Sequence, residues 1–419
     1  MNFTEFGLNE QLIAGLDAMG FEKATPIQEQ ALPLIMNKKD LIACAQTGTG
    51  KTAAFILPVI NDLMSKPYTG NSIRALVVVP TRELALQIDQ AVEGLSYFTD
   101  ISSFAVYGGG DGAGFDQQKK ALTSGTDIII ATPGKLISHL NMGYVKVDGL
   151  THFILDEADR MLDMGFVDDI MRIASFLPEK RQNLMFSATM PPKIRELAKN
   201  LLQSPEEISL SISKPAAGVM QVAYLVHEND KPKLIKRLLD KEQLTGVIVF
   251  SRTKRNVKQI ARALKGTKVS VAEMHSDLTQ DEREEVMRAF KAKRIQVLVA
   301  TDIVSRGIDI QELQLVINYD VPDEAEDYVH RVGRTARADK TGMAVTFITP
   351  LEQRTFARIE ELIDTNVLKQ PVPPEVGESF TYDPRAKSGG SRDGKGKPHF
   401  KGRRKGKGRP HRSGKPRGG

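Results

Sequence analysis

The amino-acid sequence predicts an α/β protein with two tandem, doubly wound domains, each built on a parallel sheet, and a basic tail after them. Short apolar runs rich in Val and Ile alternate with amphipathic stretches of helical length, which is typical of doubly wound folds. Several of these runs end in polar residues, and open parallel sheets bind their ligands at the carboxyl ends of strands. The length of 419 residues favours two domains over one.

The expected strands are short and bounded by polar or turn-forming residues. Three of them lie in the first half of the chain, within ALVVVP from Ala75, DIIIATP from Asp127 and HFILDEAD from His152. Three more lie in the second half, within GVIVFS from Gly246, IQVLVATD from Ile295 and LQLVINYD from Leu313. The rhythm breaks at SISKPAAG, where Pro and Gly predict a linker. We therefore expect a first domain over 1–210, a linker over 211–218, a second domain over 219–368 and a disordered tail over 369–419.

The charge of the chain is divided unevenly along its length. Of the 58 basic and 52 acidic residues, 14 basic and one acidic residue fall in 385–419, which gives +13 there and −7 in the rest. A Gly-, Lys- and Arg-rich segment cannot bury enough apolar surface to fold, so it is expected to be disordered. Such a tail suits a polyanionic partner, and the alternative is that it only keeps the protein in solution or binds another protein.

Composition and terminal sequence set limits on the class of protein. No apolar run is long enough to cross a membrane, and the first residues lack the pattern of a secretory signal. Cys44 is the single cysteine, so an intrachain disulfide is impossible and a reducing, cytoplasmic location is expected.

A phosphate-binding loop is predicted at AQTGTGKT, between an apolar strand and a helical stretch. Backbone N–H groups of a Gly-rich turn and the helix N-terminus attract phosphate oxygens. Lys51 is expected to reach the β- and γ-phosphates, and Thr52 to bind Mg²⁺. The general pattern begins with Gly, whereas this loop begins with Ala45. The remaining nucleotide-binding candidates in the loop are Gln46, Thr47, Gly48, Thr49 and Gly50.

An acidic strand end, DEAD, follows the apolar run from His152. In nucleotide hydrolases such residues hold Mg²⁺ and position water beside the phosphate loop. Asp156 is the predicted Mg²⁺ ligand, and Glu157 is predicted to orient and deprotonate the attacking water. By itself the segment could be a solvated acidic loop, but the phosphate-binding loop upstream favours the catalytic interpretation.

With both motifs in place, the chain resembles the DEAD-box helicases of superfamily 2, and the likeness runs in order from Phe3 to Thr365. The resemblance implies two RecA-like domains, an ATP-dependent RNA helicase activity and the cofactors ATP and Mg²⁺. GFEKATPIQ resembles the adenine-recognising Q motif, in which Gln28 would read the adenine edge, Phe21 would stack on the ring and Phe3 would match the upstream aromatic. SAT resembles the motif that couples hydrolysis to duplex opening, which implicates Ser187 and Thr189.

The resemblance also implies contacts to the RNA backbone from both domains. In the first domain they fall in PTRELA, the glycine pair after Tyr107, and TPGK, at Pro80, Thr81, Arg82, Gly109, Thr132, Pro133 and Gly134. In the second domain they fall on Arg252, Gln280, Arg283 and Thr301, while Asp309 would approach the ATP ribose. Lys135 and Ser276 stand where the family usually has Arg and Gly.

HRVGRTAR, from His330 to Arg337, resembles the family's arginine-finger segment. Arg334 and Arg337 are three residues apart and could face one direction from a helical turn. They would stabilise charge on the transferring phosphoryl group, and His330 is assigned to coupling.

The resemblance therefore implies a helicase that separates short RNA duplexes or remodels RNA–protein complexes, and we expect a monomeric core and no membrane partner. Two alternatives remain at this point: an RNA clamp or remodelling factor with little unwinding, and a DNA helicase. The short body and basic tail favour the bacterial RhlE-like subgroup, and ribosomal or RNA-decay proteins are candidate partners of the tail.

Overall fold

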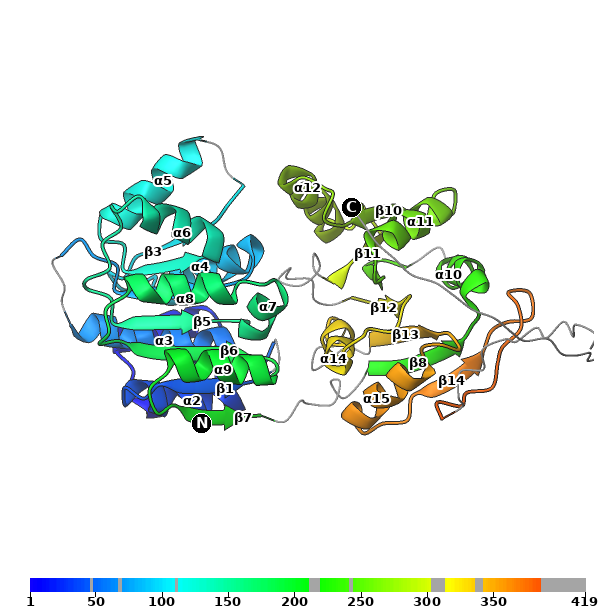
Figure 1. The fold of residues 1–419 in the computed structure, drawn as a ribbon, viewed down its shortest axis with the longest axis horizontal. Coiled ribbons are helices and arrows are strands. Elements are labelled where there is room, and N and C mark those ends of the chain that lie inside the picture. Colours follow the sequence, from blue (N-terminus) through cyan, green and yellow to red (C-terminus); the bar gives the residue numbers. More distant parts are fainter. Residues whose placement is uncertain are drawn as a thin grey trace, which may run out of the picture. The chain divides into compact units, whose positions relative to one another are not determined.

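The computed structural model describes residues 1–45, 48–66, 70–109, 112–210, 219–240, 244–302, 313–335 and 342–385. Two seven-stranded sheets form its framework, and every recorded strand pair in both is parallel (Figure 1). The expected fold class is thereby confirmed. The expected linker at 211–218 lies outside the described residues.

The first sheet has the strand order β3-β4-β2-β5-β6-β1-β7. Its strands are β1 (Leu41–Cys44), β2 (Ala75–Val78), β3 (Ser103–Val106), β4 (Ile128–Ala131), β5 (His152–Leu155), β6 (Gln182–Ser187) and β7 (Glu206–Ser209). The helices of this domain are η1 (Phe3–Phe6), α1 (Glu10–Ala18), α2 (Pro26–Met36), α3 (Lys51–Ser65), α4 (Arg82–Leu95), α5 (Gly112–Thr123), α6 (Pro133–Asn141), α7 (Ala158–Asp163), α8 (Val167–Phe176) and α9 (Pro192–Leu201).

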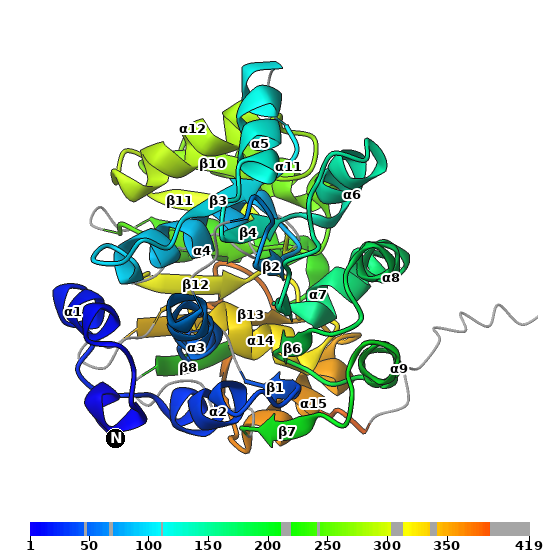
Figure 2. The same ribbon diagram turned by 90° about the vertical axis from the view of Figure 1, so that its left-hand side faces the viewer.

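Helices cover both faces of the first sheet, as the turned view shows (Figure 2). One apolar core joins the sheet to α1–α4, and the other joins it to α6–α9. β2, β4 and β5 are buried along their whole length, which explains why their sequences are continuous apolar runs without alternation.

The second sheet has the strand order β10-β11-β9-β12-β13-β8-β14. Its strands are β8 (Val219–Leu225), β9 (Val247–Phe250), β10 (Val271–Met274), β11 (Val297–Ala300), β12 (Leu315–Asn318), β13 (Gly342–Ile348) and β14 (Leu368–Pro371). The helices are η2 (Glu228–Asp230), α10 (Lys231–Leu239), α11 (Lys254–Leu264), α12 (Gln280–Lys291), α14 (Ala325–Val332) and α15 (Gln353–Ile363). α10 and α11 pack on one apolar core, and α14 and α15 pack on another.

The second domain extends beyond residue 368, its expected end. β14 pairs with β8, and after it Val372 and Val376 are buried in the core shared with α10 and α11. The Tyr382 hydroxyl donates to Glu360 Oε2 at 3.0 Å. The expectation that the tail begins at 369 is therefore corrected: residues 369–384 belong to the same compact unit as the sheet. The rest of the expected tail, 386–419, lies outside the described residues.

Within the described ranges, no helix combines the length and apolar character needed to cross a lipid bilayer.

Candidate active site

The phosphate-binding loop lies between β1 and α3, and its described glycines have a backbone conformation that suits a tight, phosphate-binding turn. Gly48 and Gly50 have φ values of 84° and 90°, in the left-handed region that favours glycine. A Cβ on Gly50 would lie 2.5 Å from Gln28 Nε2, so only glycine fits there without displacement. Ala45, before the turn, is buried against the sheet. The predicted ligands Gln46 and Thr47 lie outside the described residues.

Lys51 is the first residue of α3 and is only 6 % exposed. Within the described part of the chain, its Nζ has no hydrogen-bond partner. A buried ammonium without a partner is costly unless an anion completes it. The position at a helix N-terminus also favours negative charge. Lys51 and the glycines therefore fit the phosphates of a nucleotide, with the half-buried Thr52 one residue further along the helix.

The acidic loop follows β5, two positions from β1 in the sheet order. Asp156 is 3 % exposed, and its backbone N–H donates to Val78 O at 3.1 Å. Burial raises the pKa of Asp156 to about 6, although the positive charge of Lys51 works in the opposite direction. A buried carboxyl group of this kind is well suited to a cation, because a divalent ion would favour its charged form.

Glu157, the predicted base, has a left-handed backbone with φ of 52°. Arg160 Nη1 donates to Glu157 Oε2 at 3.0 Å. Arg160 is buried and was not singled out from the sequence, although its spacing three residues after Glu157 on α7 was a usable signal. The structure thus identifies Arg160 as the group that orients Glu157.

The SAT segment ends β6 and is hydrogen-bonded to the acidic loop. Asp159 Oδ2 accepts from the backbone N–H of Ala188 at 3.1 Å, from that of Thr189 at 2.9 Å and from the Thr189 hydroxyl at 3.0 Å. In return, the Asp159 N–H donates to Ser187 Oγ at 3.2 Å. Asp159 therefore links the acidic loop directly to the SAT segment.

Gln28 lies on α2 and is 1 % exposed. Its Oε1 accepts from the Thr25 N–H at 2.9 Å, and its Nε2 donates to Gly50 O at 3.0 Å. A glutamine amide has a second N–H and a second lone pair, so one donor and one acceptor remain for a ligand. Sequence reasoning assigned Gln28 to adenine but did not foresee this direct link to the phosphate-binding loop.

The two aromatic residues assigned to the adenine site lie beside each other. The ring centroids of Phe3 and Phe21 are 6.4 Å apart in an edge-to-face arrangement. Phe3 is buried in the core under α1–α4, whereas Phe21 is half-buried at its margin. The structure therefore leaves Phe21 as the ring accessible for stacking, and Phe3 supports it from inside.

The RNA-contact candidates of the first domain lie at the carboxyl ends of three neighbouring strands. They follow β2, β3 and β4, which are neighbours in the order β3-β4-β2. Thr81 caps α4 by accepting from the Leu84 N–H, and the Arg82 guanidinium lies 4.5 Å from the centre of the Tyr107 ring. Thr132 precedes α6, and Pro133 and Gly134 form its first turn. Pro80 follows β2 and Gly109, with φ of 89°, follows β3.

The second-domain candidates follow β9, β10 and β11, which are also neighbours in their sheet. Arg252 comes after β9, and buried Thr301 after β11. Gln280 begins α12, where Arg283 Nη2 donates to Ser276 O at 3.3 Å. The predicted ribose ligand Asp309 lies outside the described residues.

The arginine-finger segment is only partly described. Arg334 is half-buried and lies in the turn after α14, which ends at Val332, so it is not part of a continuing helix. His330 lies on α14 with its Nδ1 4.0 Å from Asp327 Oδ1. Arg337 lies outside the described residues. Between these residues, Arg331 is buried and binds both carboxylate oxygens of Asp302, at 2.7 and 2.5 Å. Sequence reasoning missed this structural arginine.

Comparison with known proteins gives two family matches and many relatives. Residues 25–197 match the family described as DEAD/DEAH box helicase, and residues 230–339 match the helicase conserved C-terminal domain. The chain is 45 % identical over 360 residues to the ATP-dependent RNA helicase CshA of Listeria monocytogenes, covering 86 % of this chain and 68 % of that one. It is 42 % identical over 362 residues to the DEAD-box ATP-dependent RNA helicase CshA of Bacillus subtilis, covering 86 % and 72 %.

Solved structures show the same architecture. Dbp5 of S. cerevisiae bound to RNA and ADP BeF3 matches with a TM-score of 0.78 at 30 % identity, covering 88 % of this chain and 95 % of that one. Mss116p bound to ssRNA and AMP-PNP matches with a TM-score of 0.77 at 28 % identity, covering 89 % and 80 %.

Proposed function

This chain belongs to the DEAD-box family of ATP-dependent RNA helicases, and on that premise we propose how its residues divide the work of ATP hydrolysis and RNA binding. The observation that carries the proposal is the buried Lys51 ammonium at the N-terminus of α3, which has no hydrogen-bond partner among the described residues, near the buried Asp156 carboxyl. A DNA helicase, one of the two alternatives, is not supported, because the relatives described above are named RNA helicases and the two solved structures described above hold RNA.

The nucleotide half of the proposal rests on the first domain. Lys51 and the backbone of Gly48 and Gly50 hold the phosphates, while Gln28 reads the adenine edge with its remaining donor and acceptor. Asp156 and Thr52 would hold Mg²⁺ together with phosphate oxygens and water, which is the usual sparse protein coordination of this ion. Bound Mg²⁺ neutralises charge on the phosphates.

Glu157 takes the proton of the attacking water, and Arg160 fixes the direction of its carboxylate. Asp159 ties this loop to Thr189, so that the acidic loop and the SAT segment move together. Arg334 and Arg337 of the second domain supply positive charge to the transferring phosphoryl group. RNA is bound through its backbone, which accounts for binding without a sequence preference.

The experiment that tests the hydrolytic assignment is an ATPase assay with and without RNA. Glu157→Gln keeps the shape of the side chain but cannot take a proton, so turnover should be nearly abolished while ATP and RNA still bind. Lys51→Ala should weaken ATP binding and stop hydrolysis. Glu179→Gln, the same change at an exposed turn, serves as the matched control. Wild-type turnover in Glu157→Gln would remove the role assigned to Glu157.

The same assay addresses the remaining alternative, an RNA clamp with little unwinding. A helicase should separate a short RNA duplex in proportion to ATP turnover, whereas a clamp would bind RNA and hydrolyse ATP without releasing strands. Turnover without strand release would favour the clamp.

Three finer assignments also belong to this proposal. The short body and basic tail support the bacterial RhlE-like subgroup, although the relatives described above carry the name CshA. The tail is assigned to RNA or to ribosomal and RNA-decay proteins on the basis of its charge of +13. A cytoplasmic location is supported by the single cysteine.

A further inference from the structure

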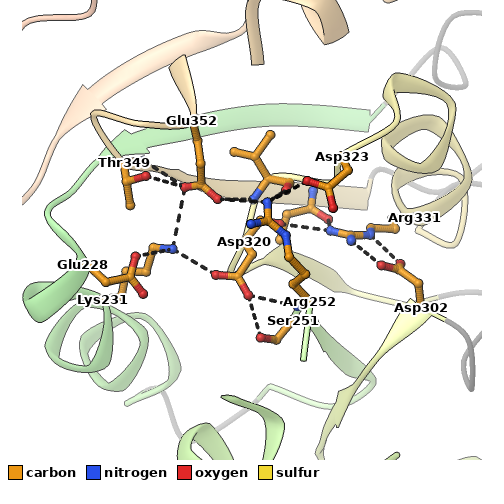
Figure 3. A network of polar contacts seen from close by, with 12 residues as sticks. Glu228, Lys231, Ser251, Arg252, Asp302, Asp320, Asp323, Arg331, Thr349 and Glu352 are labelled. Atoms are coloured by element: carbon orange, nitrogen blue, oxygen red, sulfur yellow. Dashed lines mark hydrogen bonds and ion pairs between the residues drawn. The ribbon is translucent and has the colours of Figure 1, made fainter. Parts of the chain in front are cut away.

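A network of charged side chains lies at the carboxyl ends of β9, β12 and β13 in the second domain (Figure 3). It surrounds Arg252, which the proposed function assigns to the RNA backbone, and the inference drawn from it rests on that assignment. Two cations and four carboxylates form the network: Lys231, Arg252, Glu228, Asp320, Asp323 and Glu352.

The inner part of the network is buried and densely hydrogen-bonded. Lys231 is 1 % exposed, and its Nζ lies 3.0 Å from both Asp320 Oδ1 and Glu228 Oε2. Burial opposes the charge of Lys231, but Glu352 and Asp320 outweigh it and raise its pKa, so the ammonium is kept. The second oxygen of Asp320 accepts from the Ser251 hydroxyl at 2.6 Å and from the Arg252 N–H at 2.9 Å. Asp320 therefore fixes the backbone that carries Arg252.

Glu352, like Asp320, is held in place by hydrogen bonds through both carboxylate oxygens. Its Oε2 accepts from the Thr349 N–H at 3.1 Å and from the Thr349 hydroxyl at 2.7 Å. Its Oε1 accepts from the Val321 N–H at 3.1 Å and lies 3.7 Å from Arg252 Nη2. These bonds leave Glu352 little freedom to follow or release the guanidinium.

Asp323 differs from the buried carboxylates Asp320 and Glu352. Its side chain is 72 % exposed, and its Oδ1 lies 3.0 Å from Arg252 Nη2, where it makes its sole recorded ion pair in the described part of the chain. Arg252 is itself 47 % exposed, and its Nη2 also donates to Val321 O at 3.0 Å. An ion pair between exposed side chains is weak and can exchange partners readily.

The balance of charge favours that exchange. Four carboxylates face two cations, so the network carries a surplus of two negative charges. A phosphate that approached Arg252 with Asp323 still in place would meet this surplus at close range. The neighbouring Arg331–Asp302 pair is balanced and offers no compensation.

We propose that Asp323 occupies the phosphate-binding side of Arg252 in the RNA-free chain and is displaced when an RNA phosphate arrives. Asp323 thereby lowers the affinity of the core for RNA, while Lys231, Asp320 and Glu352 hold Arg252 in position for the exchange. The competing partner is a phosphodiester, because a guanidinium that pairs with a carboxylate pairs equally well with phosphate.

The test measures the RNA concentration that half-maximally stimulates the ATPase of the full-length protein. Asp323→Asn should lower this concentration by about two- to fivefold, the range expected for loss of an exposed ion pair, and should leave turnover at saturating RNA unchanged. Glu324→Gln is the matched control, because it removes the same charge one residue away and has no recorded contact with Arg252 in the described ranges. Thermal unfolding checks that each variant is folded.

Arg252→Ala completes a double-mutant cycle. The single variant Arg252→Ala should raise the half-maximal RNA concentration. When Asp323→Asn is added to Arg252→Ala, it should change this concentration no more than Glu324→Gln does. The proposal is overturned if Asp323→Asn behaves like Glu324→Gln in the wild-type background, or if its effect persists without Arg252. If Arg252→Ala leaves the half-maximal RNA concentration unchanged, Arg252 does not bind RNA, and the proposal for Asp323 is wrong as well.

Discussion

Replacing Asp156 by asparagine should make the nucleotide-free protein more stable while it disables the enzyme. Burial raises the pKa of this carboxyl from 3.8 to about 6 in the folded chain, against the attraction of Lys51. A carboxyl group with a raised pKa holds its proton more tightly when folded. Its contribution to stability is therefore full at low pH and is lost as the pH rises from about 4 to about 6.

A difference of about two pKa units corresponds to about 3 kcal/mol of lost stability above pH 6, and to about half of that at pH 5. Asp156→Asn removes the cost of the buried charge but also leaves Lys51 without its nearby carboxylate, so a net gain of about 1–3 kcal/mol is expected at pH 8. For a domain of this size, the gain raises the Tm by about 3–8 °C.

Calorimetry or circular dichroism is the suitable assay, because the chain contains no Trp. The Tm difference between variant and wild type should grow from pH 5 to pH 8, whereas Asp148→Asn, at an exposed position, should show no such trend. Mg²⁺ and ATP should raise the Tm of the wild type and hardly that of Asp156→Asn. A variant that is less stable than wild type at pH 8, or a gap that is independent of pH, would refute the reasoning.

Three further predictions follow from the site and the tail. Gly50→Ala places a Cβ 2.5 Å from Gln28 Nε2 at a residue whose φ is 90°. It should lower the free energy of unfolding by about 1–3 kcal/mol and raise the KM for ATP. An unchanged KM would contradict the role of this loop in phosphate binding. Thr189→Val removes the hydroxyl bond to Asp159, worth about 1 kcal/mol, and should slow duplex unwinding more than ATP turnover; equal losses would count against a coupling role. Deleting 385–419 should preserve turnover at saturating RNA and reduce the slope of log affinity against log salt by a few units, since each phosphate contact contributes about 0.7–0.9; an unchanged slope would rule out the tail as an RNA tether.

The sequence predicted the sheets well, because buried parallel strands are apolar along their whole length and stand out between helices. All six apolar runs quoted from the sequence contain strands of the structure. The loops that follow β1, β5 and β6 were also predictable, since their residues are consecutive in the chain and the sheet order brings them together.

Contacts between distant side chains were not predictable in the same way. Nothing local to Gln28 indicates that its amide reaches Gly50, and nothing local to Lys231 indicates that it pairs with Asp320 and Glu352. The end of the second domain was misplaced for a related reason. The segment after residue 368 has the Pro-rich composition of a linker, yet its few apolar residues pack into a core that the rest of the domain has already formed.

The strand β14 has a practical consequence for shortening this protein. It covers one side of β8, which would otherwise be the last strand of the second sheet. A truncation placed at residue 369 would strip most of this cover and expose a row of unpaired backbone N–H and C=O groups, which is a template for self-association. It would also discard Val372 and Val376 from the interior. A truncation after Arg385 avoids both effects. Aggregation of a fragment that ends at 369 would therefore be caused by the exposed edge of β8 and not by loss of the basic tail.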